Sequence, residues 1–329
     1  MAIRIAEELR DSTYLISQLL EDQYVGAHYQ KRLYGSTTVL SKPVRKAYLI
    51  ISATLEEPFN SLNKWKIVLN GVALTREYNP HIEREFMNGI HSVFVYDVTS
   101  VVKESEVRLE LSYDGKERIK IDTATLITLH EYPKMHTFIE GLIDLVPLEN
   151  NYSMNYGSTE SFEPNEAKLY IGLNSFRQTR ISVLDVSGKE LYSGILPLGF
   201  YLLELAVEAR CRNFVVQPSA PAAKHMFNIL TLTYAKYPRI VVENVEMSGS
   251  RIKATISNVG ESDAEDVMLV VLKLGATIAH KRIGTLQSGE RKDVELELRD
   301  VGLAIPRRIL RVIWRYGGKL FTHDITLST

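Results

Sequence analysis

Cysteine is almost absent from this sequence, and its absence excludes whole classes of site. Cys211 is the only cysteine among 329 residues, so the chain has no internal disulfide framework and no zinc or iron–sulfur site built from several thiolates. Long apolar runs are missing as well. The most apolar stretches, at 195–207 and 267–274, contain charge or stop short of the roughly 20 residues that cross a bilayer. We therefore expect no membrane insertion.

A strong charge of either sign is also missing. Lys and Arg number 39 against 40 for Asp and Glu, a formal net charge of −1, which gives no overall attraction to nucleic acid or to an anionic membrane. Basic clusters at 42–46 and 307–311 each precede an apolar strand pattern, where charge protects a sheet edge from aggregation. We therefore expect no nucleic-acid partner.

The motifs of common catalytic sites are missing too. No Gly-x-Gly-x-x-Gly, Gly-x4-Gly-Lys-Ser/Thr, Gly-x-Ser-x-Gly or His-Glu-x-x-His occurs. Six positions and a proline separate His130 from His136, which is not the helical spacing of zinc ligands. A metal site would need the fold to bring His81 and His91 to them. The sequence predicts no catalytic residue, metal or cofactor, and a protein that is not an enzyme.

Alternation of apolar and polar residues is what the sequence has in abundance. Residues 106–113 place Val107, Leu109 and Leu111 on one face and charge on the other, the pattern of a half-buried strand. Asp114-Gly115 then predicts a hairpin turn into the next alternating run, at 116–121. Helical patterning is scarce: only residues 2–20 partly fit it, and two short strands explain them equally well. The chain is predicted to be mainly β.

The strand candidates fall into three blocks, each large enough for one two-sheet core. The first, residues 1–135, ends near Tyr132-Pro133, and the second, residues 136–238, ends at Tyr237-Pro238. Residue preferences before proline favour extended connections there. The third block covers residues 239–329. We expect three consecutive antiparallel β-sandwich domains.

The third block carries a recognisable pattern of turns. Asn258-Val259-Gly260 is followed by a small residue, Ala264, before a long apolar strand, and then by Leu286-Gln287-Ser288-Gly289 before the next strand. This pattern resembles the CARDB family of immunoglobulin-like modules in archaeal and bacterial surface proteins. The resemblance implies an immunoglobulin-like domain that serves adhesion or spacing, with no catalytic residues. The lone cysteine and six glutamines also match the avoidance of labile side chains in thermophiles.

The first block resembles galactose-binding-like jelly rolls. The residues that carry this resemblance are Asn70-Gly71 after an apolar strand and Tyr96-Asp97-Val98-Thr99 before another. Lys103-Glu104-Ser105 stands where that superfamily usually has Gly-x-Asn. Sugar-binding aromatic residues of such modules lie in variable loops, so none can be assigned by position here. The middle block resembles no family and is expected to be a further, unassigned sandwich.

The segment most typical of a binding site is the polar loop at 149–166. Tyrosine rings offer apolar platforms with a polar tip, and asparagine side chains both donate and accept hydrogen bonds, which suits sugar hydroxyls or a protein partner. The predicted ligand-binding residues are Asn151, Tyr152, Asn155 and Tyr156. A plain linker between two sandwiches is the other interpretation of this loop.

Together these patterns predict a non-enzymatic, modular β-sandwich protein for binding or assembly, such as an adhesin or a filament or surface component. Its partner would be another protein or further copies of itself joined through sheet edges, with residues 3–20 as a donated strand. Two alternatives stay open: a carbohydrate-binding protein that uses the jelly-roll block and the 149–166 loop, and a hydrolase with a site between domains. A glycan is thus a further candidate partner.

The cellular location is left open by two conflicting indications. The CARDB-like resemblance suggests a cell-surface or extracellular protein. Residues 1–23, however, contain five acidic side chains and no basic segment followed by an apolar one, so no secretory signal peptide is expected. A cytoplasmic location is the alternative.

Overall fold

The chain folds into antiparallel β-sheets, as its alternating pattern predicts. The computed structural model describes residues 2–60, 62–86, 89–157, 163–298 and 307–328, and within these ranges it contains 23 strands and no helix. No helix in the described ranges could therefore span a membrane. The expectation of a mainly β protein made of several antiparallel sandwiches is confirmed.

The strands form two compact units, Met1–Tyr234 and Ala235–Thr329, here called the N-terminal and C-terminal units. Their boundary lies close to the one expected after Pro238. The boundary expected at 135/136 is different, because it falls inside the 30-residue strand β9, Arg118–Pro147. The first two predicted sandwiches therefore share a strand and belong to one compact unit. Tyr132-Pro133 is extended, as expected, but it continues a strand instead of ending a domain.

A large sheet runs through the N-terminal unit, and β1 (Ile3–Gly26) pairs with β9 along its side. The other seven strands follow the order β14-β11-β16-β9-β3-β7-β6, with bounds Gly199–Ala206, Glu166–Ser175, Ala223–Ala235, Arg118–Pro147, Val44–Leu55, Gly89–Asp97 and Ile82–Phe86. Two smaller sheets complete the unit. One has the order β2-β8-β4-β5, with bounds Arg32–Thr38, Glu106–Asp114, Lys64–Leu69 and Val72–Thr75. The other has the order β10-β15-β12-β13, with bounds Tyr152–Asn155, Asn213–Pro218, Thr179–Asp185 and Glu190–Leu196.

The N-terminal segment that fitted a helix or two short strands is one continuous strand. β1 pairs with β9 from Ile3↔Ile143 to Gly26↔Arg118. The pairing contains two register shifts, one between Arg10 and Ser12 and one between Gln18 and Leu20, and Asp11 in the first of them adopts a positive φ angle of 47°. Such bulges bend a strand and turn an edge away from neighbours. Because residues 3–20 are already paired within their own chain, they are not a free strand for donation.

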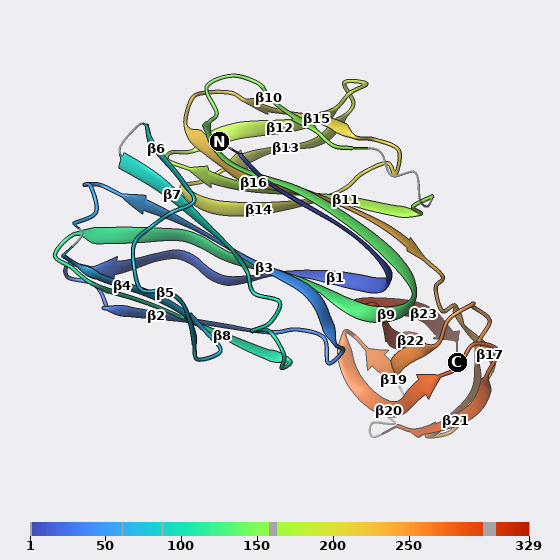
Figure 1. Cartoon of the computed structure of the whole chain (residues 1–329). Coiled ribbons are helices and arrows are strands. Elements are labelled where there is room, and N and C mark those ends of the chain that lie inside the picture. The colour runs from blue at the N-terminus through green and yellow to red at the C-terminus, as the bar shows by residue number, and fades with distance from the viewer. Residues whose placement is uncertain (1, 61, 87–88, 158–162, 299–306, 329) are drawn as a thin grey trace. The chain divides into compact units, whose positions relative to one another are not determined.

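The N-terminal unit has four layers, which Figure 1 shows stacked over one another. One face of β3 and β7 packs against the β2-β8-β4-β5 sheet, and one face of β11 and β16 packs against the β10-β15-β12-β13 sheet. The opposite faces of these two parts of the large sheet pack on each other through Ile50, Val93, Ile127, Met226 and Ile229. The large sheet is therefore apolar on both faces, which explains its continuous apolar runs.

Asp114-Gly115 connects two layers instead of closing a hairpin. β8 pairs with β2 and β4, whereas β9 pairs with β1 and β3. Leu109 and Leu111 of β8 nevertheless share one core with Ile119 and Ile121 of β9. The expected hairpin is therefore wrong, since the two alternating runs face each other across a core and do not pair edge to edge.

The C-terminal unit is a separate sandwich of two antiparallel sheets. The first sheet has the order β17-β18-β21, with bounds Ile240–Ser248, Arg251–Asn258 and Arg291–Glu297. The second has the order β20-β19-β22-β23, with bounds Ala276–Leu286, Ala264–Lys273, Arg307–Tyr316 and Lys319–Ser328. Seven strands in two sheets match the size of an immunoglobulin-like sandwich.

Asn258 of the Asn-x-Gly motif holds several backbone segments of the C-terminal unit together. The Asn258 side chain is fully buried and its Nδ2 donates to the carbonyl oxygens of Ser262 and Leu286, at 2.8 and 3.0 Å. Its Oδ1 accepts from the backbone N–H groups of Arg239 and Gly260, both at 3.1 Å. Asparagine is needed here because it can both donate and accept twice.

Candidate functional site

Charged and polar side chains gather between the two inner layers of the N-terminal unit. Asp122 of β9 and Lys224 of β16 are both fully buried, and the Lys224 Nζ lies 2.8 Å from the Asp122 Oδ2. Sequence reasoning did not find this pair, because 102 positions separate its members. The available signal was a charged residue close to an apolar, threonine-rich run: Asp122 stands directly before residues 123–129 and Lys224 shortly before residues 226–233.

The Lys224 ammonium has an acceptor for each of its three N–H groups. It donates to the Asp122 carboxylate, to the Thr54 hydroxyl at 2.9 Å and to the His91 Nδ1 at 2.8 Å. That arrangement leaves the His91 Nε2–H to donate to the carbonyl oxygen of Phe86 at 3.2 Å. The polar cluster, defined as Ser52, Thr54, His91, Lys120, Asp122, Asn174 and Lys224, therefore joins strands from both inner layers.

Asp122 is the acceptor at the centre of the polar cluster. Burial by itself would raise its pKa, but the ammonium groups of Lys224 and Lys120 and the hydrogen bond from Lys224 outweigh burial and hold that pKa below its usual range. Asp122 Oδ2 also accepts from the hydroxyls of Ser52 and Thr54, at 3.2 and 2.9 Å. We conclude that Asp122 and Lys224 form a charged, hydrogen-bonded ion pair.

His91 is held neutral beside this ion pair. Burial, and then the positive charge of Lys224, lower the pKa of His91 to about 4. A second buried histidine, His225, directly follows Lys224 on β16. Burial lowers the pKa of His225 to about 3, and its Nε2 lies 3.0 Å from the Asn228 Nδ2. Both imidazoles therefore act as hydrogen-bond partners in their neutral form near pH 7.

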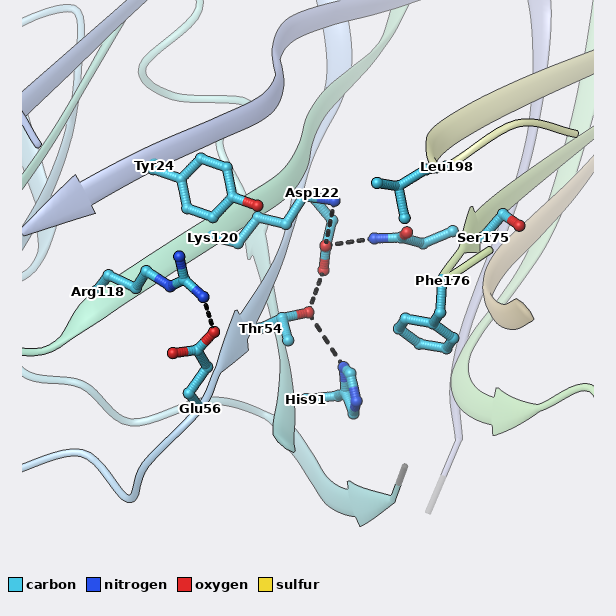
Figure 2. A pocket seen from close by; sticks show the side chains of 11 residues that line it. Tyr24, Thr54, Glu56, His91, Arg118, Lys120, Asp122, Ser175, Phe176 and Leu198 are labelled. Carbon is cyan, nitrogen blue, oxygen red and sulfur yellow. Dashed lines mark hydrogen bonds and ion pairs between the residues drawn. The ribbon is translucent and has the colours of Figure 1, made fainter. Parts of the chain in front are cut away.

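A cavity of about 200 Å³ opens beside the polar cluster. Figure 2 shows Lys120, Asp122 and the Tyr24 ring on one side of it and Phe176 and Leu198 on the other. Arg118 and Glu56 form an exposed ion pair within the lining. The Lys224 and His91 nitrogens are already hydrogen-bonded inside the protein, so the groups left to bind a ligand are the other polar side chains of the lining.

Asn174 of β11 is the member of the lining with unused capacity. It is 2% exposed, and its Nδ2 donates to the Asp122 Oδ1. Its Oδ1 is buried and has no hydrogen-bond partner within the described part of the chain. No group of three or more His, Cys, Asp or Glu side chains in the described ranges is arranged to hold a metal ion.

The four predicted ligand-binding residues lie elsewhere, on and around β10. The alternation of this short strand turns the two tyrosines inward, where the Tyr152 ring lies 4.3 Å from the His225 ring and Tyr156 is buried against Phe214. Asn151 and Asn155 are exposed. The tyrosine rings therefore face the protein interior while the asparagine amide groups face solvent. Ligand binding by these four residues stays a prediction.

A second candidate feature is the free edge of the large sheet at β14. Antiparallel pairing with β11 runs from Gly199↔Ser175 to Ala206↔Lys168. The Phe200 N–H donates away from β11, to the Asp22 Oδ2 at 2.8 Å. Because alternate residues of an antiparallel strand hydrogen-bond on alternate sides, the N–H and C=O groups of Leu202 and Glu204 also point away from β11.

Apart from the Asp22 carboxylate at Phe200, the β14 edge has few of the features that protect a sheet edge. Its sequence, Gly-Phe-Tyr-Leu-Leu-Glu-Leu-Ala, has one charged residue, Glu204, which pairs with Lys168 of β11. Among the other described edges, β6 and β21 are rich in charge, β5 and β10 have four residues each, and β1 contains two bulges. β13 also has one charge, but it contains Gly194 and is followed by Pro197, both of which weaken a strand.

Comparisons with known proteins give only distant structural matches. No protein-family model and no curated protein matches the chain. A β-glucuronidase from Ruminococcus gnavus is 11% identical with a TM-score of 0.21, covering 58% of this chain and 35% of that one. A β-D-glucuronidase from Dictyoglomus thermophilum is 10% identical with a TM-score of 0.21, covering 99% of this chain and 44% of that one. The chain thus spans less than half the length of these enzymes, and the matches assign it no family.

Proposed function

We propose that this chain is a non-enzymatic binding and assembly protein, and that copies of it associate by pairing their β14 edges. The observation that carries the proposal is the free, apolar edge of β14. An unprotected edge strand presents unpaired N–H and C=O groups to any second strand. Addition of such a strand supplies main-chain hydrogen bonds together with apolar side-chain contacts.

A second copy of the chain suits this edge because the edge is self-complementary. Two β14 strands related by a two-fold axis run antiparallel, and such an isologous contact closes into a dimer. With the axis near Leu202, Glu204 lies opposite Phe200 of the other copy, so the two Glu204 side chains do not face each other. The exposed Leu198, directly before β14, adds apolar surface next to the pairing edge.

Substitution of Glu204 by proline tests the proposal because it removes an outward N–H group and leaves the pairing with β11 intact. Proline is tolerated on the free side of an edge strand. The matched control is Glu204→Ala, which loses the same side chain, including its ion pair with Lys168, but keeps the N–H. Light scattering after gel filtration should show a dimer for the natural chain and for Glu204→Ala.

Glu204→Pro should shift the equilibrium to monomers. Each dimer loses two symmetric hydrogen bonds worth about 0.5–1.5 kcal/mol apiece. Steric contact of the proline ring with the incoming strand weakens pairing further, so the dissociation constant should rise at least about 10-fold. A natural chain that stays monomeric over the whole concentration series, or a Glu204→Pro chain as dimeric as its alanine control, would refute pairing through β14.

A further inference from the structure

The cavity beside the polar cluster contains hydrogen-bonding capacity that the described part of the chain does not use. The buried Asn174 Oδ1 lacks a donor, and its Nδ2 cannot exchange places with it, because the Asp122 carboxylate requires a donor there. A buried acceptor without a partner lowers the stability of the folded state. A ligand that brings an O–H group to Asn174 would recover that stability.

Lys120 supplies the opposite capacity in the same lining. Its Nζ lies 2.5 Å from the Asp22 Oδ1 and 3.7 Å from the Asp122 Oδ1. An ammonium group has three N–H donors, so at least one is available to an oxygen in the cavity. Figure 2 shows the Tyr24 hydroxyl directed toward the same space. A ligand must therefore both donate and accept over a short distance, as hydroxyl groups do.

The charges around the cavity favour a neutral ligand. Lys224 pairs with Asp122, Lys120 with Asp22 and Arg118 with Glu56. Each cation has its own carboxylate, so a charged ligand would bring an unbalanced charge into a partly buried site, at a large desolvation cost. A neutral molecule with several hydroxyl groups makes the same hydrogen bonds without that cost.

The apolar part of the lining favours a ring over an extended chain. Phe176, Leu198 and the Tyr24 ring provide flat or aliphatic surfaces, and the C–H face of a saturated ring packs against such surfaces. The volume of about 200 Å³ is below the roughly 300–1,000 Å³ of sites for drug-sized ligands. From these features we propose that the cavity binds one neutral, polyhydroxylated ring, such as a single hexose or a cyclic polyol.

Titration calorimetry on the full chain tests this inference with D-glucose, D-galactose, D-mannose and myo-inositol as neutral probes. Glucuronate, glucosamine and acetamide are the comparison probes, representing an anion, a cation and a small amide. The cavity lies beside the β14 edge, so dimer formation could affect binding. The titration is therefore repeated on the Glu204→Pro chain, which separates a failure of dimer formation from a failure of ligand binding. At least one neutral polyol should bind with a dissociation constant of about 10 mM or lower.

Leu198→Trp blocks the cavity without disturbing the core, since Leu198 is 70% exposed and lines the opening. Leu274→Trp, at a leucine that is 83% exposed in the C-terminal unit, is the matched control. Polyol affinity should fall about 10-fold or more in Leu198→Trp and stay unchanged in the control. Three results would overturn the inference: no polyol binds, Leu198→Trp binds as the natural chain does, or a charged probe or acetamide binds more tightly than every neutral polyol.

Discussion

Acidification from pH 7.5 to pH 5 should strongly destabilise the N-terminal unit, because two of its buried histidines are neutral in the folded state. Burial, together with Lys224 in the case of His91, lowers the pKa of His91 to about 4, and burial lowers that of His225 to about 3. The unfolded chain binds a proton on each near pH 6.5. Protons therefore favour the unfolded state, and stability that is complete above pH 6.5 is lost as pH falls toward the folded pKa values.

The magnitude follows from these pKa values. At pH 5 each histidine contributes a loss of about 2 kcal/mol, so the pair contributes about 4 kcal/mol. In the middle of this range the free energy of unfolding should fall by about 3 kcal/mol per pH unit, equivalent to two protons taken up on unfolding. The pKa of His130 is also lowered by burial, which adds a loss of the same sign.

The two tryptophans allow each unit to be followed separately within the full chain. Trp65 is buried in the N-terminal unit and Trp314 in the C-terminal unit. Urea unfolding followed by fluorescence, with Trp314→Phe to isolate Trp65, gives the free energy of unfolding at each pH. The C-terminal unit is an internal control, because both of its histidines, His280 and His323, are exposed.

Replacing one histidine assigns the effect. His225→Gln keeps an acceptor near Asn228 but cannot bind a proton, so the slope of the Trp65 transition should fall by about 1.4 kcal/mol per pH unit. A Trp65 transition whose slope corresponds to less than one proton between pH 5 and 6.5 would refute the reasoning. So would equal pH dependence of the Trp314 transition.

Three further experiments test the packing. Lys224→Met should destabilise the N-terminal unit by about 3–5 kcal/mol, because it leaves the Asp122 charge buried without its ion-pair partner. Adding Asp122→Leu should restore much of that lost stability. Urea unfolding of the single and double variants measures both effects. Asn258→Ala should cost the C-terminal unit about 2–4 kcal/mol, since four backbone groups lose their partner, and the Trp314 melting temperature should fall by about 10 °C or more. Gly35→Ala should cost about 1–3 kcal/mol by chemical denaturation, because a Cβ there would lie 2.2 Å from the Leu19 carbonyl oxygen; an unchanged midpoint would contradict that close approach.

The sequence was sufficient to predict strands that have one solvent-exposed face and one buried face. The alternating run at 106–113 corresponds to β8, because solvent on one side and core on the other impose a period of two. The same period does not say which strand lies next to which. The runs on either side of Asp114-Gly115 alternate whether they pair in one sheet or face each other across a core, and they do the latter.

The polar cluster could not be predicted because it depends on long-range pairing. Asp122 and Lys224 meet only because β9 continues past Tyr132-Pro133 to pair next to β16, which brings two parts of the large sheet face to face. Local sequence gives no sign of that continuation, since Tyr-Pro fits both a linker and an extended strand. Each charged residue by itself resembles an ordinary interruption of an apolar run.

A buried ion pair at this place gives the N-terminal unit something that apolar packing cannot supply. The inner layers meet through isoleucine, phenylalanine and methionine side chains, whose attraction has no direction and would allow several alignments. Hydrogen bonds from Lys224 and Asn174 on one layer to Asp122 on the other have fixed directions, so a shifted alignment would leave these buried groups without partners. Within the large sheet, Asn174 lies opposite Phe200 in the register of β11 and β14, and Asp22, which pairs with Lys120, accepts the Phe200 N–H. Asn174 and Lys120 thus contact both the lining of the cavity and the residues that hold the start of β14.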